Sequence, residues 1–452
     1  MNHPIFSAPD LATFTGLDAL GLTPIGQYLT TAKAEILCQV TTPDPWCGNC
    51  GSEGSPRDTV TRKVSHAPFG WRPTILIIRH RRYRCHACRH VWRENLSQAV
   101  APRQKITRTA VHWALTGLVC QHLSVARIAE GLGVSWNTAN DAVLAEGQRL
   151  LINDPTRFDG VTVLGVDEHV WRHTKTGDKY VTVVVDLTPV RQKSAPARLL
   201  DMVPGRSKAV FKTWLAERDE QWKTGIEVVA MDGFTGFKTA SAEELPEAVE
   251  VLDPFHVVKL GSDALDKTRQ RVQREQHGRR GLKDDPLYKA RRTLSVGLGL
   301  ATEKQKSKIE ELFTEPVYQP VELVWSVYQR MVDAYRQPKP EIGKWALSML
   351  IEEIGAKVPA GLPELKRLGT TLKRRKNDIL AYFDHVGSSN GPTEALNGRL
   401  EHLRGIALGF RNLAHYIAWS LLEAGGFRSG LNPQLLRAAL LVLSIYERSL
   451  AQ

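Results

Sequence analysis

The chain has 452 residues, of which 42 % are hydrophobic, a composition typical of a folded protein with room for several domains. Sixty Lys and Arg residues against 48 Asp and Glu residues leave a net charge of +12, which favours a polyanionic partner. The longest apolar runs, such as residues 181–185, are far shorter than a membrane span, and no secretion signal precedes them. We therefore expect a multidomain cytoplasmic protein that does not associate with membranes.

Four of the six cysteines form two C-x-x-C pairs, after a segment, residues 1–37, that we expect to be an N-terminal arm. Two such pairs supply the four thiolates of a tetrahedral structural zinc site, so residues 38–98 are predicted to form a zinc ribbon. Coincidental pairs of buried thiols, or redox use of one pair, are the alternatives. The expected zinc ligands are Cys47, Cys50, Cys85 and Cys88.

The predicted ribbon lies within a strongly basic segment. Between Arg57 and Arg108 there are thirteen Lys and Arg residues against two acids, Asp58 and Glu94. Such a block attracts nucleic acid through charge and counterion release, although a solvated basic face is the plainer explanation for a charge run. The expected DNA contacts in this segment are Arg79, Arg81, Arg82 and Arg84.

Residues 99–155 are expected to form an all-α helix-turn-helix domain. Ser124 can cap one helix and Gly133 can supply a tight turn before the next, which is the layout of a motif whose second helix enters the major groove. Any short helical pair can imitate this pattern, so the basic ribbon before it carries part of the argument. The residues predicted to face outward toward DNA are Ser135, Trp136, Asn137, Thr138 and Asn140.

From residue 156 to residue 260, strand-like runs alternate with helical ones. Three strands in close succession, then a helix and another strand, match a ribonuclease-H-like α/β domain. In that arrangement the first and fourth strands are neighbours, so Asp167 and Asp232, each placed at the end of a predicted strand, would lie side by side. Taken singly, an Asp at a strand end more often caps a turn.

The next segment, residues 261–380, is predicted to be a helical insertion, because no convincing strand occurs between residues 255 and 390. Ten basic residues against three acids between Lys267 and Arg292 indicate a surface that grips DNA or a second protomer, or the solvated face of an independent helical domain. Residues 381–430 would complete the catalytic domain, with Glu394 at the start of a helix, and residues 431–452 would form a C-terminal helix.

Three carboxylates converging from two strand ends and a helix suit a pair of Mg²⁺ ions, which prefer hard oxygen ligands. Two such ions about 3.5–4 Å apart clamp the attacking and the leaving oxygen of a phosphodiester. We therefore predict Asp167, Asp232 and Glu394 as catalytic residues that hold two Mg²⁺ ions in each site, with Mn²⁺ as a substitute.

These features together resemble a known family, the bacterial insertion-sequence transposases of the DDE type in the ISL-type group. The motifs that carry the resemblance are the two C-x-x-C pairs, Gly165-Val-Asp-Glu168, Met231-Asp-Gly233, the segment from Asp253 to Lys259, and the segment from Ser389 to Arg399 followed by Gly409-Phe-Arg-Asn412. The resemblance implies that Asp167, Asp232 and Glu394 form the metal-binding triad and that Arg399 contacts DNA. It also implies a nucleoid-associated bacterial protein.

The function implied is a transposase that binds the terminal inverted repeats of its element and catalyses Mg²⁺-dependent strand cleavage and strand transfer on double-stranded DNA. Chemistry at two ends implies a homodimer on DNA. Two rival functions are a DNA-binding regulator derived from such an element and a RuvC-like nuclease. All three triad residues are present, which argues against the regulator, and the ribbon precedes the catalytic domain, which argues against the nuclease.

Overall fold

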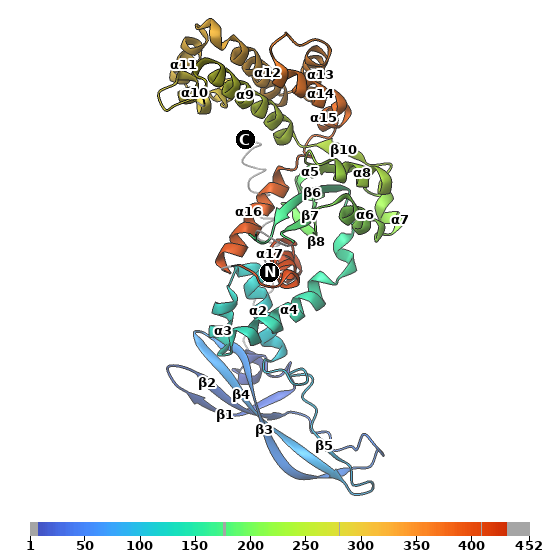
Figure 1. The fold of residues 1–452 in the computed structure, drawn as a ribbon. Helices are drawn as coiled ribbons and strands as arrows, with labels where there is room; N and C mark the ends of the chain where they lie inside the picture. The colour runs from blue at the N-terminus through green and yellow to red at the C-terminus, as the bar shows by residue number, and fades with distance from the viewer. Residues whose placement is uncertain (1–7, 175–177, 280, 408, 432–452) are drawn as a thin grey trace. The chain divides into compact units, whose positions relative to one another are not determined.

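The computed structural model describes residues 8–174, 178–279, 281–407 and 409–431, and they form two compact units. One unit combines the chain up to Arg157 with the segment from Ala418 onward, and the other consists of residues from Phe158 to Ile417 (Figure 1). The predicted C-terminal helix, residues 431–452, lies outside the described residues except for Leu431. No helix in the described ranges is long and apolar enough to cross a membrane.

The first unit is built on a five-stranded sheet. Its elements are α1 (Leu11–Thr15), β1 (Leu22–Leu29), β2 (Ala34–Val40), β3 (Gly54–Phe69), β4 (Arg72–Cys85) and β5 (Val91–Arg93). The strands lie in the order β1-β2-β4-β3, and β5 pairs with β4. β3 and β4 make a long antiparallel hairpin in which Gly54 lies opposite Cys85. This register places the first residue of β3 beside the last residue of β4, so the segments that precede β3 and follow β4 lie close to each other.

The prediction that residues 1–37 form an arm is wrong for their described part, because β1 and most of β2 fall within it. Ala34, Ile36 and Cys38 are buried at alternate positions of β2, which is the period-two pattern of a half-buried strand. The pattern is short and interrupted by polar residues, so it is easily overlooked. Cys38 is fully buried among the hydrophobic residues of this core.

The first unit also contains the helices that follow the sheet in the chain. They are α2 (Arg108–Gln121), α3 (Val125–Leu132), α4 (Trp136–Gly147), the π-helical turn η1 (Gln148–Ile152) and, from the later part of the chain, α18 (Arg428–Leu431) and the end of α17 (Leu413–Ala424). Ser124 Oγ accepts a hydrogen bond from Arg127 N, and Gly133 adopts a left-handed conformation with φ of +63°. The predicted cap and turn between two helices are therefore confirmed.

The second unit contains a mixed sheet flanked by short helices. The 3₁₀ turn η2 (Pro155–Phe158) contains the boundary between the units. The elements after it are β6 (Val163–Val170), β7 (Tyr180–Asp186), α5 (Thr188–Arg191), β8 (Arg198–Pro204), α6 (Lys208–Ala216), α7 (Glu220–Thr224), β9 (Val228–Met231), α8 (Thr235–Glu244) and β10 (Val249–Leu252). The strand order is β10-β9-β6-β7-β8. β6 and β9, the first and fourth strands of the domain, are therefore adjacent and parallel, as the sequence predicted.

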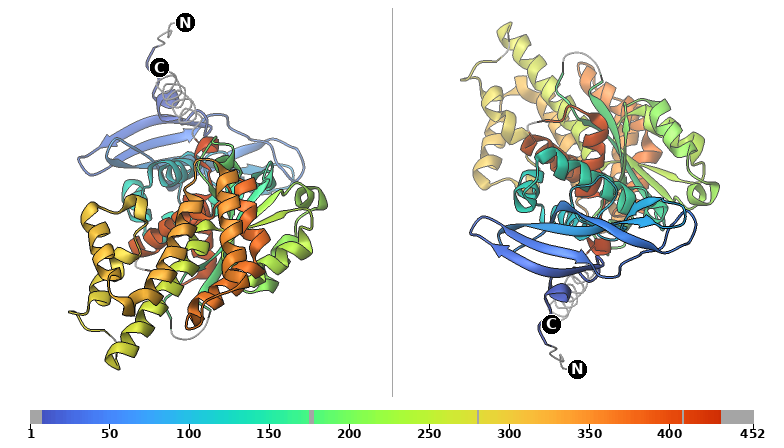
Figure 2. Two further views of the ribbon diagram at one scale, coloured as in Figure 1. Left: turned by 90° about the horizontal axis from the view of Figure 1, so that it is seen from above. Right: turned by 90° about the horizontal axis from the view of Figure 1, so that it is seen from below.

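A set of helices separates β10 from the last helix that packs on the sheet, α16 (Gly391–Ile406). The views in Figure 2 show these helices, coloured olive to orange, packed against one another. They are α9 (Pro254–His277), α10 (Pro286–Leu294), η3 (Leu298–Leu300), α11 (Glu303–Phe313), η4 (Pro316–Tyr318), α12 (Gln319–Tyr335), α13 (Pro340–Ala356), α14 (Pro363–Arg374) and α15 (Lys376–Asp384). No strand occurs in the described residues of this insertion.

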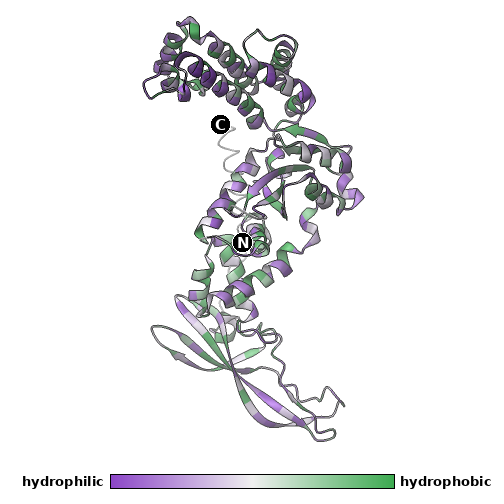
Figure 3. Cartoon of the chain, in the orientation of Figure 1, coloured by the Kyte–Doolittle hydropathy of each residue, from purple (hydrophilic) through white to green (hydrophobic). Residues whose placement is uncertain are grey.

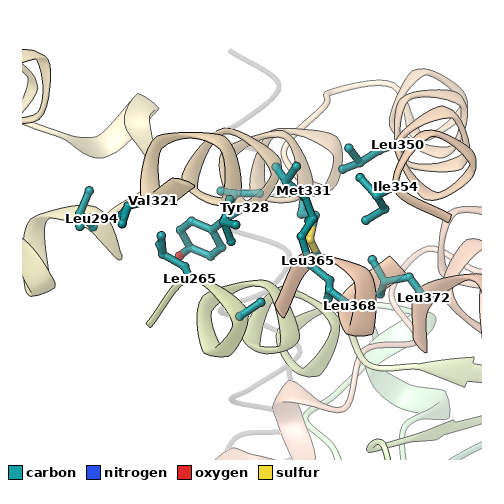
Figure 4. Packing of buried hydrophobic residues seen from close by; sticks show 14 of the residues in the cluster. Leu265, Leu294, Val321, Tyr328, Met331, Leu350, Ile354, Leu365, Leu368 and Leu372 are labelled. Carbon is teal, nitrogen blue, oxygen red and sulfur yellow. The ribbon is translucent and has the colours of Figure 1, made fainter. Parts of the chain in front are cut away.

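The insertion has its own hydrophobic core, to which Met331, Leu350 and Leu372 contribute from three different helices (Figure 4). Hydrophilic and hydrophobic residues alternate along its helices in Figure 3, as expected of helices that bury one face. The predicted boundaries at residues 261 and 380 are wrong, because α9 and α15 run through them unbroken. The insertion therefore begins at Pro254, where Asp253 caps α9, and ends at Asp384.

Candidate functional sites

The four predicted zinc ligands gather at one end of the β3–β4 hairpin. Their sulfur atoms lie 3.6 Å apart between Cys47 and Cys88, and 3.5 Å apart between Cys50 and each of Cys85 and Cys88. In a tetrahedron with metal–sulfur bonds of about 2.3 Å, the sulfur atoms are separated by about 3.8 Å. The four thiols therefore fit a single zinc ion with little adjustment.

Local backbone geometry shapes this cysteine cluster. Gly51 N donates to Cys47 O at 2.8 Å, which closes the first C-x-x-C turn, and Cys88 N points to Cys85 Sγ at 3.4 Å in the second. A backbone hydrogen bond from Ser52 is the largest of several that lower the pKa of Cys50 to about 6. Burial and the hydrogen bonds from the other three cysteines raise the pKa of Cys88 to about 11, so one thiolate in the cluster opposes a second unless a cation is bound.

The four arginines of β4 that are predicted to contact DNA differ in their exposure and in their acidic partners. Arg79 and Arg84 are exposed. Arg81 N donates to Glu94 Oε2 at 2.8 Å, and its guanidinium lies 3.6 Å from the same carboxylate. Arg82 Nε donates to Asp58 at 2.6 Å. Arg79 and Arg84 are thus available to phosphates, whereas Arg81 and Arg82 already have acidic partners.

The predicted outward face of α4 needs one correction. Ser135, Trp136 and Asn137 are exposed, and Thr138 is half-buried. Asn140 is only 2 % exposed, and its Oδ1 accepts a hydrogen bond from Trp419 Nε1 at 3.2 Å. The prediction that Asn140 faces outward is wrong, because its position on the helix points it into the core of its own unit.

Asp167 and Asp232 occupy neighbouring positions on the second sheet. The last pair in the parallel β6–β9 ladder is Val166 with Met231, so the next residues along each strand are the two aspartates. Adjacent strands lie about 4.8 Å apart, which sets the backbone separation of these residues. β6 continues to Val170 in its pairing with β7, so Asp167 lies within the strand and does not end it, contrary to the prediction.

Asp167 is largely buried and held at both oxygens. Oδ1 accepts from Glu168 N at 2.8 Å, and Oδ2 accepts from Asn397 Nδ2 at 2.9 Å. Burial, together with the charges of Asp232 and Glu394, raises the pKa of Asp167 to about 7, although the hydrogen bond from Glu168 N and the charge of His256 oppose this rise. Several acids therefore act on one another here, and a bound cation would relieve their repulsion.

The loop after Asp232 is anchored by a buried arginine. Asp232 Oδ1 accepts from Phe234 N at 2.8 Å, and Arg375 Nη1 donates to Gly233 O at 2.6 Å. Arg375 is 7 % exposed and also donates to Asp378, whose carboxylate accepts from Lys238 Nζ at 2.6 and 2.8 Å. The insertion thereby fixes the backbone beside Asp232.

The helix that carries Glu394, α16, begins directly on β6. A Cβ atom on Gly165 would lie 2.5 Å from Thr393 Oγ1 and 3.0 Å from Asn390 Oδ1, so only glycine permits this approach. Asn390 Nδ2 donates to Val166 O at 3.2 Å. Glu394 is half-buried in the first turn of the helix. Glu394 and Asn397 are both on α16, and Asn397 donates to Asp167, so Glu394 lies on the same side of the sheet as this contact.

A further carboxylate and a histidine lie beside Glu394. One potential ligand atom from each of Asp253, His256 and Glu394 falls within 4.8 Å of the others. Asp253 is fully buried, accepts from Asn390 N at 2.7 Å and from Phe255 N at 3.0 Å, and thus ties α9 to α16. Asp253 Oδ2, 3.5 Å from Nδ1 of His256, raises the pKa of that imidazole, and Asp232 adds to the effect.

The other acids of these segments have separate partners. Arg206 Nη1 lies 3.2 Å from both carboxylate oxygens of Glu168, and Arg198 Nε donates to Asp186 at 2.8 Å. Glu401, on the same helix as Glu394, is exposed and pairs with Arg404. Arg399 is exposed. None of these acids belongs to the group around Asp167.

Two residues of this group, Asn397 and Arg375, were not predicted from the sequence. Asn397 lies three residues after Glu394, the spacing of neighbours on one helix face, so helical geometry could have indicated it. Arg375 is 142 positions from Gly233, and no sequence pattern connects them.

Comparison with known proteins agrees with this arrangement. Residues 164–420, more than half of the chain, match the transposase model of the ISL3 family, and residues 43–88 match the zinc finger of the transposases IS204, IS1001, IS1096 and IS1165.

Two named relatives extend this similarity. The transposase for insertion sequence element IS1557 of Mycobacterium tuberculosis, in strains CDC 1551 / Oshkosh and H37Rv, is 27 % identical over 326 residues, covering 68 % of this chain and 69 % of the relative. The transposase for insertion sequence element IS1001 of Bordetella parapertussis is 23 % identical over 376 residues, covering 82 % and 86 %. The chain belongs to the ISL3 family of insertion-sequence transposases.

Proposed function

We propose that this ISL3-family transposase binds the terminal inverted repeats of its element and performs Mg²⁺-dependent DNA cleavage and strand transfer with Asp167, Asp232 and Glu394. The observation that carries the proposal is the packing of β6 against both β9 and α16, the elements that carry or directly precede the three acids. The β6–β9 register supports the pairing of the two aspartates, and the seating of α16 on Gly165 supports the approach of Glu394. The strand order also supports a ribonuclease-H-like core.

In this proposal the three acids hold two divalent cations. Mg²⁺, or Mn²⁺ in its place, would activate the attacking oxygen and stabilise the leaving oxygen of a phosphodiester. Asn397 keeps Oδ2 of Asp167 in one orientation, and Arg375 holds the backbone next to Asp232. Burial of Asp167 excludes water from one side of the group. The reaction frees a 3′-hydroxyl at the end of the element, which then attacks target DNA.

Recognition of the ends is assigned to the first unit. The zinc ribbon offers the exposed Arg79 and Arg84 to phosphates, and α3 and α4 act as a helix-turn-helix with Trp136 and Asn137 on the exposed side. Arg399 supplies a contact close to the acids. Because two ends are processed, the active species on DNA is a homodimer.

The test uses duplexes that carry the ends of the element from which this chain derives. Asp167→Ala, Asp232→Ala and Glu394→Ala should each retain end binding and lower the rate of Mg²⁺-dependent cleavage by about 10³-fold or more, because each removes charge stabilisation of the transition state. Glu401→Ala is the matched control, since it removes an exposed carboxylate from the same helix as Glu394.

Full cleavage by Glu394→Ala, or loss of cleavage by Glu401→Ala alone, would show that the helix contributes a different acid. Binding without cleavage in the wild-type protein would favour a regulator. Cleavage without strand transfer would favour a nuclease of the RuvC type.

A further inference from the structure

We propose that the exposed side of α14 binds the phosphate backbone of duplex DNA next to the catalytic acids. We name this surface the α14 basic face and define it by Lys366, Arg367, Lys373 and Arg374, all four of which are exposed. The inference rests on the proposed function, because it assumes that DNA reaches the acids. The inference identifies α14 as the part of the insertion that binds this DNA.

The basic side chains share one side of α14. Leu365, Leu368 and Leu372 are buried in the core of the insertion and fix the inward side. At 3.6 residues per turn, the four basic positions fall within an arc of about 120° on the opposite side. All four charges therefore project from a single outward surface and do not ring the helix.

These four basic side chains differ from those of adjoining helices in their ion pairing. Among the described residues, none of the four forms an ion pair, whereas Lys344, Lys376 and Arg330 on adjoining helices pair with acids at 2.6, 2.7 and 2.7 Å. Glu364 is the single acid of α14, and its carboxylate accepts from Arg271 Nε at 2.9 Å. The charge of Lys373 also acts on Glu352, whose carboxylate is paired with Lys376. The α14 basic face thus keeps four positive charges without an ion pair of their own, an arrangement that attracts a polyanion.

The face is rigidly held. A Cβ atom on Gly369 would lie 2.2 Å from Ile354 O, so the backbones of α13 and α14 are in close contact. Three leucines anchor the same helix, as described above. Because the backbone does not need to reorganise, the basic side chains can meet phosphates at little further conformational cost.

The face also adjoins the catalytic loop. Arg374 ends α14, and the next residue, Arg375, donates to Gly233 O beside Asp232. Consecutive Cα atoms are about 3.8 Å apart, so the basic face starts within a few ångströms of the residue that touches that loop. The helix has 12 residues and spans about 18 Å, the length over which a duplex presents about ten phosphates. Its size and place suit DNA that leaves the acids along the insertion.

The test compares two double variants of the full-length protein. Lys366→Ala/Lys373→Ala removes charge from the α14 basic face, and Lys304→Ala/Lys308→Ala removes the same charge from exposed positions of α11, where three glutamates balance the lysines. Binding of a labelled random-sequence duplex is measured between about 50 and 200 mM salt without added Mg²⁺. Each lost phosphate contact should reduce the slope of log K against log salt by about 0.9.

The α14 double variant should therefore lose about 1.8 from the slope and bind several-fold more weakly, while the α11 variant keeps the wild-type slope. Equal slopes for both variants would overturn the proposal. Loss of self-association by the α14 variant with an unchanged slope would also overturn it, and would assign the face to a second copy of the chain. The binding measurement does not require cleavage. It therefore tests the α14 basic face even if the proposed catalytic residues are wrong.

Discussion

The cysteine cluster and the acid group are two sets of potential metal ligands that are built in opposite ways. The cysteines lie on two turns joined by one hairpin, and Cys47 and Cys88 are 41 positions apart. The acid group draws on β6, β9 and α16, and Asp167 and its partner Asn397 are 230 positions apart. The first arrangement needs a single hairpin register, whereas the second needs a sheet, a separately packed insertion and a helix seated on that sheet.

This difference determines what each arrangement depends on. A ligand set within one hairpin is affected mainly by its metal, since zinc replaces a large hydrophobic core in small domains. A ligand set drawn from distant segments depends on packing far from any ligand, such as the contact of Gly165 with α16. Substitutions outside the ligands should therefore distinguish the two.

The largest effect is expected from Cys50→Ser. Loss of one thiolate should release zinc and unfold the ribbon, because structural zinc contributes about 10 kcal/mol or more of apparent binding energy. Metal analysis and hydrogen exchange of residues 43–93 measure the result. Cys120→Ser, which changes a cysteine outside the cluster, should keep its zinc. Equal zinc content in both variants would contradict the assignment, and unfolding of the second unit would show that the two regions are not independent.

Arg375→Ala should have the next largest effect. It removes the donor to Gly233 O and one partner of the buried Asp378, which should cost about 3 kcal/mol of unfolding free energy and weaken Mn²⁺ binding at Asp232. Denaturant titration and calorimetric Mn²⁺ titration measure these quantities. Arg330→Ala breaks an exposed pair with Glu353 and should cost no more than about 1 kcal/mol. If both substitutions lower the unfolding free energy by a similar amount, Arg375 does not stabilise the backbone beside Asp232 as inferred.

Gly165→Ala should cost about 1–3 kcal/mol, because the new Cβ would overlap Thr393 Oγ1 and push α16 away from β6. Cleavage should fall as well, since Glu394 moves with the helix. Gly398→Ala is the control on α16 itself: its Cβ would meet no atom within 4 Å, and alanine should stabilise the helix by up to about 1 kcal/mol. Thermal unfolding of both variants checks the contrast. A stable and fully active Gly165→Ala protein would contradict it.

The smallest effect concerns His169, whose Nε2 lies 2.7 Å from Tyr416 OH in a buried site. Burial, aided by the charge of Arg404, lowers the pKa of His169 to about 4. The unfolded chain therefore binds more protons between pH 4 and the ordinary pKa of about 6.5, and stability is lost as pH falls through this window.

At about pH 5.5, the stability advantage of the wild type over His169→Gln should have shrunk by about 1 kcal/mol relative to neutral pH. His402→Gln, which replaces an exposed histidine of α16, is the matched control. Thermal unfolding at the two pH values makes the comparison. A pH-independent difference for His169→Gln would mean that the imidazole titrates normally in the folded protein.

Prediction from sequence succeeded where spacing or strand order carries the information. The gathering of the four cysteines follows from two C-x-x-C pairs on one hairpin, and the adjacency of β6 and β9 follows from the order of strands and helices. It failed for residues 22–40, whose alternation is short, and for Asn140, whose burial depends on Trp419, 279 positions away. The roles of the three acids and of the DNA-contacting residues stay predictions.

Arg375 illustrates what sequence could not provide. Its role depends on the backbone carbonyl of Gly233. Every residue has such a carbonyl, so the sequence does not indicate which one accepts this hydrogen bond. The same holds for Asp253, whose carboxylate accepts a hydrogen bond from the backbone of Asn390, 137 positions away. Contacts to backbone atoms across long separations become visible only after the fold is known.

The insertion between β10 and α16 has a consequence for synthesis on the ribosome. Translation completes the cysteine hairpin and the helices α2–α4 long before it reaches Glu394, because the insertion is made in between. A chain that ends before Glu394 therefore also lacks Trp419 and α18, which complete the unit that contains α2–α4. Premature termination within the insertion should therefore leave both units incomplete, so neither unit can finish folding until translation has passed α17.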